Sequence, residues 1–182
     1  DKRAELVDEL LASVEYGRHF GNLWHNRIIP LSAENARDYK VVLFQWLADN
    51  FNRNRPWSEM VSDLVLAEGE IAKTPATLFY MSPANTMEGY VHADRVAGSV
   101  AELFLGVNLR CAQCHDHPFA SWKQTEFWEM AAFFGRVGFT KKTGEKILVE
   151  SKEVMGRGSE PTKARADATI ATPGGRRGGR EG

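Results

Sequence analysis

The two cysteines of this 182-residue chain stand three positions apart and are followed directly by a histidine, in the run Cys111-Ala112-Gln113-Cys114-His115. This Cys-x-x-Cys-His spacing is typical of covalent c-type haem attachment. Two thiols about one helical turn apart can add to the two haem vinyl groups and form thioethers. The next histidine then lies beneath the porphyrin, where a ring nitrogen can bind iron. The pattern predicts one covalent haem c on Cys111 and Cys114, with His115 as the proximal iron ligand.

Three other interpretations of these residues stay open. A redox-active dithiol also uses Cys-x-x-Cys, but usually at the start of a helix that follows a strand. A zinc site would take Cys111, Cys114, His115 and His117, although four ligands within seven residues suit one tetrahedron poorly. The two thiols can also be buried and inert.

The sequence offers several candidates for a second axial iron ligand, a position that haem proteins either fill or leave open. His117 is too close to His115 along the chain to reach the same iron. We expect it to bond a haem propionate or to fix the loop, with Asp116 orienting it. The remaining candidates are His19, His25, His92, Met60, Met81, Met87, Met130 and Met155. Of these, Met60 and Met130 lie on apolar stripes and are expected in the core.

Aromatic residues are frequent just after the motif, and we expect them to cover the haem and exclude water. Lower exposure and lower local polarity raise the reduction potential, because they disfavour the ferric charge. The residues are Phe119, Trp122, Phe127, Trp128, Phe133 and Phe134.

Apolar residues at helical spacing predict a mainly α, irregular helical domain of about five to six helices. We expect Pro56 at the first position of the third helix, and Thr125 as the N-cap of the last, which ends near Gly135 or Gly138. Only Lys146–Val149 resembles a strand. The helical stripes lie in 6–14, 39–47, 57–65, 92–107 and 127–134.

Charge is unevenly distributed along the chain. Residues 1–155 carry 17 Lys and Arg against 21 Asp and Glu, and residues 156–182 carry six against three. The total of −1 therefore combines an acidic body at −4 with a basic segment at +3. The second segment has no aromatic residue and seven of the 16 glycines, so it cannot bury enough apolar surface to offset its ordering entropy. We expect a helical domain over 1–155 and a flexible Gly/Arg-rich tail or linker over 156–182.

Composition excludes several function classes. The near-neutral charge argues against a generally basic nucleic-acid binder, and two cysteines are too few for a disulfide-dense scaffold. No apolar run approaches the roughly 20 residues of a membrane-spanning helix. Phosphate loops, nucleophile elbows and zincin motifs do not occur, so we expect an electron carrier rather than a catalyst. The start at Asp1, without Met, suggests a segment of a longer protein.

The stretch Phe104–Phe119, with the sequence FLGVNLRCAQCHDHPF, resembles the signature of the planctomycete-type cytochrome domain family, bacterial domains of unknown function. The resemblance implies a longer, exported parent protein of the periplasm or cell envelope. Many relatives have a histidine at the position of Leu23. His19 shares that helix face one turn earlier and is the first distal candidate. Other similar stretches, within roughly the first 138 residues, are 6–13, 16–20, 54–57, 123–128 and 131–134.

The sequence therefore predicts a c-type haem electron-transfer module that passes one electron between donor and acceptor domains. The first alternative is a non-catalytic structural or binding domain, whose 111–117 segment binds a metal such as zinc or only packs. The second is a thiol redox module that uses Cys111 and Cys114.

Overall fold

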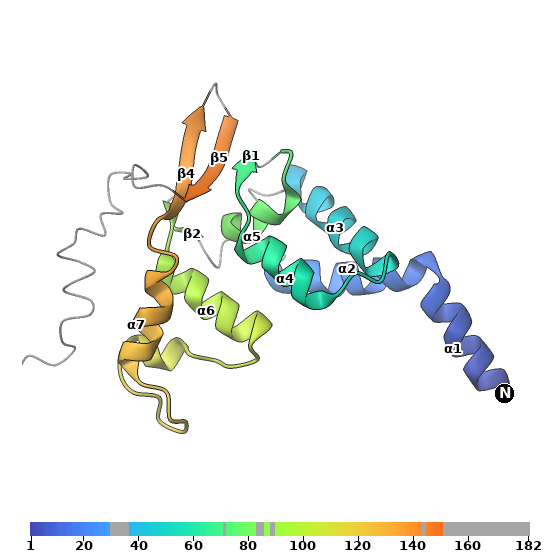
Figure 1. The fold of residues 1–182 in the computed structure, drawn as a ribbon, viewed down its shortest axis with the longest axis horizontal. Coiled ribbons are helices and arrows are strands. Elements are labelled where there is room, and N and C mark those ends of the chain that lie inside the picture. The colour runs from blue at the N-terminus through green and yellow to red at the C-terminus, as the bar shows by residue number, and fades with distance from the viewer. Residues whose placement is uncertain (30–36, 71, 83–85, 88–89, 143–144, 151–182) are drawn as a thin grey trace, which may run out of the picture.

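The described part of the protein is mainly helical, as predicted, and a small sheet joins the helices (Figure 1). The expected flexible tail over 156–182 lies outside the described residues, and so does Met155. The computed structural model describes residues 1–29, 37–70, 72–82, 86–87, 90–142 and 145–150.

Seven α-helices lie in these residues, slightly more than the five to six that were expected. In chain order they are α1 (Lys2–Ala12), α2 (Val14–Ile28), α3 (Arg37–Asn52), α4 (Trp57–Val65), α5 (Leu78–Met81), α6 (Ala93–Phe104) and α7 (Gln124–Ala132). Two short 3₁₀ helices, η2 (Pro75–Thr77) and η3 (Arg110–Gln113), precede α5 and α7.

The first predicted stripe, over 6–14, lies in α1 except for Val14, which begins α2, and no stripe was predicted over the rest of α2. Ser13 has an extended backbone, with φ −78° and ψ 151°, and its hydroxyl donates to the Leu10 carbonyl at 2.8 Å. This residue ends α1 and redirects the chain into α2. No residue of α1 is buried, and α1 projects away from the other helices in Figure 1. The apolar residues of this stripe are therefore not part of the core, and Leu6, Val7, Leu10 and Leu11 are exposed.

Glycines allow α2 to approach α3 closely. Gly17 and Gly21 are buried one turn apart on α2, opposite Ala48 of α3. A Cβ on Gly21 would lie 2.9 Å from the Ala48 nitrogen, closer than real Cβ atoms come. The Gly17 amide donates to Asn52 Oδ1 at 2.9 Å, so a hydrogen bond between the helices accompanies the close packing.

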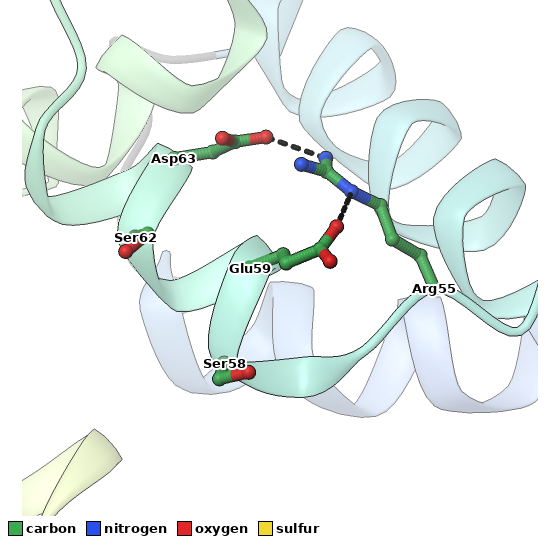
Figure 2. Close-up of a pocket in the computed structure, with 5 residues that line it drawn as sticks. All are labelled: Arg55, Ser58, Glu59, Ser62 and Asp63. Carbon is green, nitrogen blue, oxygen red and sulfur yellow. Dashed lines mark hydrogen bonds and ion pairs between the residues drawn. The ribbon is translucent and has the colours of Figure 1, made fainter.

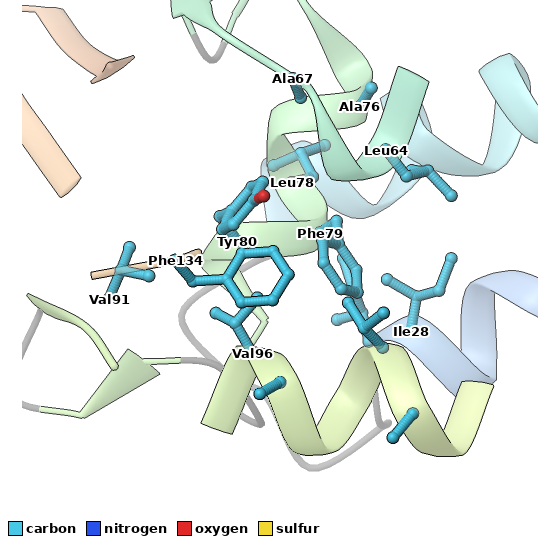
Figure 3. Close-up of a cluster of buried hydrophobic side chains, with 14 of the residues drawn as sticks. Ile28, Leu64, Ala67, Ala76, Leu78, Phe79, Tyr80, Val91, Val96 and Phe134 are labelled. Carbon is cyan, nitrogen blue, oxygen red and sulfur yellow. The ribbon is translucent and has the colours of Figure 1, made fainter. Parts of the chain in front are cut away.

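The hydrophobic core lies between α6 and the η2–α5 segment, with Ile28 of α2 and Leu64 of α4 beside it (Figure 3). Phe79 and Tyr80 are almost fully buried there. The Tyr80 hydroxyl donates to the Val65 carbonyl at 2.5 Å, which satisfies a buried polar group. Met60 is fully buried, as expected, and Met130 packs against the core while partly exposed.

Two strands that follow α7, β4 and β5, form a three-stranded antiparallel sheet with the much earlier strand β1, in the order β1-β5-β4. The expected strand at 146–149 lies within β5 (Glu145–Glu150), and this prediction is confirmed. β4 (Val137–Lys142) was not predicted, because Gly138 was interpreted as the end of a helix. Phe139 pairs with Leu148 in this hairpin. The remaining strands are β1 (Gly69–Glu70), β2 (Thr86–Met87) and β3 (Tyr90–Val91).

Two helix starts differ from the predictions by one or two residues. Pro56 is the N-cap of α4 and precedes its first residue. α7 begins at Gln124, so Thr125 is not its cap. The Lys123 amide donates to Glu126 Oε2 at 2.7 Å, and the Gln124 amide donates to the carboxylate of Asp116 at 3.0 Å. The first turn of α7 is thus capped by acidic side chains, one of them from the motif loop.

None of the helices in the described ranges is both long and apolar enough to cross a bilayer.

Candidate functional site

The Cys-x-x-Cys-His run forms one helical turn on the surface. Cys111 lies in η3, and the amides of Cys114 and His115 both donate to the Cys111 carbonyl, at 3.3 and 3.4 Å. Both cysteines are free thiols with exposed side chains. Their exposure does not agree with the interpretation of buried, inert thiols. Two thiols and an imidazole on this turn are therefore accessible from solvent.

The two residues between the cysteines hold this turn against the helices. Ala112 is fully buried. The side-chain Nε2 of Gln113 donates to Asp94 Oδ2, in the first turn of α6, at 2.7 Å. The Gln113 carbonyl accepts from Gln124 Nε2 at 3.2 Å and from Trp128 Nε1 at 3.1 Å, both on α7. Because this pair packs inward, Cys111 and Cys114 remain on the outer side of the turn.

His115 is exposed, and one of its ring nitrogens is already engaged. Nδ1 lies 2.7 Å from the carbonyl oxygen of Asp116. A carbonyl oxygen only accepts hydrogen bonds, so Nδ1 carries the proton in this contact. In the neutral ring the lone pair is then on Nε2. Metal-binding histidines are commonly held in this way, with the second nitrogen donating to a backbone carbonyl.

Asp116 connects the motif to the start of α7. Its carboxylate accepts from the Gln124 amide at 3.0 Å and from Lys123 Nζ at 2.9 Å. These two hydrogen bonds, the amide first, lower the pKa of Asp116. The same carboxylate raises the pKa of Lys123. From the sequence we expected Asp116 to orient His117. In the structure its carboxylate binds Lys123 and the first residue of α7.

His117 fixes the loop that follows the motif. Its backbone amide donates to the Trp122 carbonyl at 2.9 Å, and its Nδ1 accepts from the Phe119 amide at 3.2 Å. Both hydrogen bonds lie within the loop, as in the loop-fixing role expected for His117, and the bond to a haem propionate stays a prediction. Phe119 stands at the surface of this closed loop with 93% of its area exposed.

The aromatic residues after the motif do not form one cover. Phe127 and Phe134 are buried in the core, and Trp128 is partly buried against it. Phe119, Trp122 and Phe133 are exposed. Phe119 and Trp122 share the loop of the motif, whereas Phe133 follows the other end of α7. The exposed aromatic side chains of the loop that follows the motif are therefore Phe119 and Trp122.

The distal candidate His19 is not brought to the motif. It is exposed on α2 and contacts Phe20 edge to face at 5.2 Å. In Figure 1, α2 lies beside α3, across the molecule from α7 and the loop before it. His25 is buried on the same helix, and Met60 is buried in the core. His92 is the N-cap of α6.

The zinc interpretation needs a cluster of ligands. Among the described residues, no three side chains of His, Cys, Asp or Glu are grouped closely enough to hold a metal ion.

A comparison with protein families matches residues 1–138 to the family described as a protein of unknown function, PSCyt2 (DUF1549). The chain belongs to this family. The match covers three quarters of the chain, and the motif, α6 and α7 all lie within the matched residues. The family is cytochrome-like in name, and its description leaves the function open. The comparisons with curated proteins and with solved structures found no match.

A charged cluster at the corner between α3 and α4 also lies within the matched residues (Figure 2). Arg55 donates to Glu59 at 3.1 Å, to Asp63 at 2.5 Å and to Asn50 Oδ1 at 3.2 Å. Asn54, just before it, has a positive φ of 49°, a conformation that asparagine tolerates. The two carboxylates raise the pKa of Arg55.

This cluster was not predicted from the sequence. The i, i+4 spacing of Glu59 and Asp63 on α4, one turn after an arginine, is the signal that could have found it. The cluster lines a shallow pocket of about 330 Å³ with Ser58 and Ser62. Since the guanidinium is already bound by two carboxylates, the cluster holds the α3–α4 corner rather than a ligand.

Proposed function

We propose that this chain is a haem-binding electron-transfer module of a bacterial cell-envelope protein. One observation carries the proposal: the two free cysteines and His115 lie exposed on a single helical turn, and the Nδ1 of His115 is already bound to a carbonyl. The exposed thiols are accessible to the two vinyl groups of a haem. The free Nε2 lone pair suits an iron ligand.

Different residues of this chain would hold the haem in different ways. Cys111 and Cys114 would each add S–H across a vinyl double bond, so that sulfur bonds to one carbon and the proton goes to the other. His115 would bind through Nε2 and keep Nδ1 on the Asp116 carbonyl. Ala112 and Gln113 anchor the turn to α6 and α7, which keeps the three reactive side chains in place. Haem iron bound there supplies a one-electron couple.

The surrounding surface supports an electron carrier that works with other domains. Phe119 and Trp122 lie in the loop that follows the motif, and both are exposed. They offer a wall against which a flat apolar ring can pack. A haem on this face would stay near the protein surface, where an electron can pass to a redox partner. We therefore propose donor and acceptor domains as its partners, and the periplasm or cell envelope as its location.

The test is covalent attachment. The chain is given a signal peptide, exported from bacteria that carry a cytochrome c maturation system, denatured, and assayed by pyridine haemochrome and in-gel peroxidase stain. We expect one haem per chain, no covalent haem in the Cys111→Ala/Cys114→Ala variant, and an altered iron spectrum in His115→Ala. Ser121→Ala, an exposed change in the same loop, is the matched control and should load fully. An exported, folded wild type without covalent haem would refute the proposal.

Two further measurements on the same preparations separate the alternatives. Stoichiometric zinc that is lost in His117→Ala would favour a structural metal domain. A reversible two-electron thiol–disulfide couple, lost when Cys111 or Cys114 is replaced, would favour a thiol redox module. The haem proposal predicts neither result.

A further inference from the structure

Asp116 binds to two different parts of the protein through two different groups. Its carbonyl oxygen lies 2.7 Å from Nδ1 of His115. Its carboxylate accepts from the Gln124 amide at 3.0 Å and from Lys123 Nζ at 2.9 Å. One residue thus joins the imidazole of the motif to the first turn of α7.

Three interactions stabilise the Asp116 carboxylate at the start of α7. Gln124 is the first residue of α7, and its amide has no acceptor within the helix. The start of a helix also carries a partial positive charge, which favours an anion there. The ammonium of Lys123 adds a charge-assisted hydrogen bond. These contacts restrain the side chain of Asp116 and, through it, the backbone of the same residue.

The restraint matters because a peptide carbonyl can rotate. A loop residue without side-chain contacts could turn its carbonyl away from the neighbouring imidazole and towards water. His115 is exposed, so water would readily replace the carbonyl at Nδ1. Neutral histidine in water prefers the proton on Nε2, which removes the lone pair from that nitrogen. The contact with the Asp116 carbonyl therefore selects the less favoured tautomer.

We propose that Asp116 is a positioning residue for His115. By holding Asp116 to the start of α7, its carboxylate keeps the carbonyl on Nδ1–H and leaves the lone pair of His115 on Nε2. The use of Nε2 as an iron ligand rests on the proposed function, whereas the tautomer is a property of the haem-free chain. The two claims can therefore fail separately.

The test measures the tautomer directly in the haem-free chain. The protein is labelled with ¹⁵N-histidine, and two-bond ¹H–¹⁵N correlations are recorded at a pH where the imidazoles are neutral. In the wild type we expect His115 to show a protonated Nδ1 and an unprotonated Nε2. In Asp116→Ala the populations should move to a majority of Nε2–H. His19, exposed on another helix, is an internal reference in every spectrum.

Glu126→Ala is the matched control. Glu126 caps the same helix end by accepting from the Lys123 amide at 2.7 Å, whereas the hydrogen bonds of the Asp116 carboxylate go to Gln124 and Lys123 Nζ. Both variants remove one acidic cap from α7, so fraying of the helix should be similar in circular dichroism. Only Asp116→Ala should change the His115 tautomer. If Asp116→Ala does not fold, Asp116→Asn takes its place in the test. Asparagine keeps an acceptor for the Gln124 amide without the negative charge, so this variant should retain most of the Nδ1–H form.

Three results would overturn the proposal. They are an Nε2–H majority in the wild type, an unchanged tautomer in folded Asp116→Ala, and an equal change in Glu126→Ala. In the haem-loaded chain, a donor hydrogen bond at Nδ1 makes the imidazole a stronger ligand. The midpoint potential of Asp116→Ala should then rise relative to Glu126→Ala. If the wild type carries no haem, the proposed function fails while the tautomer result still stands.

Discussion

The close approach of α2 to α3 can be tested with one methyl group. Gly17 is buried on α2, and a Cβ at this position would collide with the Ala48 carbonyl and with the side chain of Asn52. Gly98, in the middle of α6, is also buried, but its Cβ would meet only Arg110, at 3.8 Å, which is an ordinary contact. Gly17→Ala and Gly98→Ala therefore make the same chemical change in two different spaces.

The space around each glycine sets the expected change in the free energy of unfolding. Overpacking at Gly17 costs about 1–3 kcal/mol. Displacing Asn52 loses the hydrogen bond from the Gly17 amide, a further cost of about 1 kcal/mol. The higher helix propensity of alanine returns about 1 kcal/mol at most. The net destabilisation of Gly17→Ala is then about 1–3 kcal/mol, whereas Gly98→Ala should gain up to about 1 kcal/mol from propensity alone.

Thermal and urea unfolding, followed by circular dichroism, measure this difference. Each kcal/mol moves the Tm of a chain of this size by about 2–4 °C. We expect the two variants to differ by about 1–4 kcal/mol, and therefore by roughly 2–16 °C in Tm. Equal stability of the two variants would refute the α2–α3 packing. It would also remove the basis for placing His19 away from the motif, because this packing fixes the position of α2.

Three further substitutions test the core and the motif loop. Phe127→Ala should lose about 3–5 kcal/mol in urea unfolding, because Phe127 is 2% exposed, whereas Phe133→Ala, at an 82% exposed position, should stay within about 0.5 kcal/mol of wild type. Tyr80→Phe should lose about 1 kcal/mol with the hydrogen bond to the Val65 carbonyl, and an unchanged Tm would contradict that bond. The lowered pKa of Asp116 means that its stabilising contribution is present above the unfolded pKa of about 3.9 and is lost as pH falls through the folded pKa. The Tm difference between wild type and Asp116→Ala should accordingly shrink in acid, and a pH-independent difference would argue against the carboxylate contacts.

Sequence periodicity found most of the helices because burial of one face repeats every three to four residues. The stripe at 92–107 corresponds to α6 and the stripe at 57–65 to α4. The same logic missed α2, because its buried face is formed by Gly17, Gly21, His25 and Ile28, of which only Ile28 is a large apolar residue. β4 was missed for a different reason: a short strand after a helix offers few alternating positions, and Gly138 is equally typical of a helix end.

The motif itself could be predicted, but its surroundings could not. The spacing of Cys111, Cys114 and His115 is a local property that places all three on one turn. The partner of Asp116 depends on how α7 returns to the loop, and this contact spans eight residues. Composition also could not separate Phe119 from Phe127, because both are aromatic and close to the motif. Only the packing of α7 shows that one is exposed and the other buried.

The placement of the motif separates its chemistry from the stability of the fold. Cys111, Cys114 and His115 are exposed, so replacing them removes little buried apolar area. The residues that hold the turn, Ala112 and Gln113, face inward and are not the reactive ones. Variants of the three reactive side chains should therefore fold with nearly wild-type stability, within about 0.5 kcal/mol. A loss of haem in such a variant then reports on attachment, whereas a motif that formed part of the core would confound attachment with unfolding.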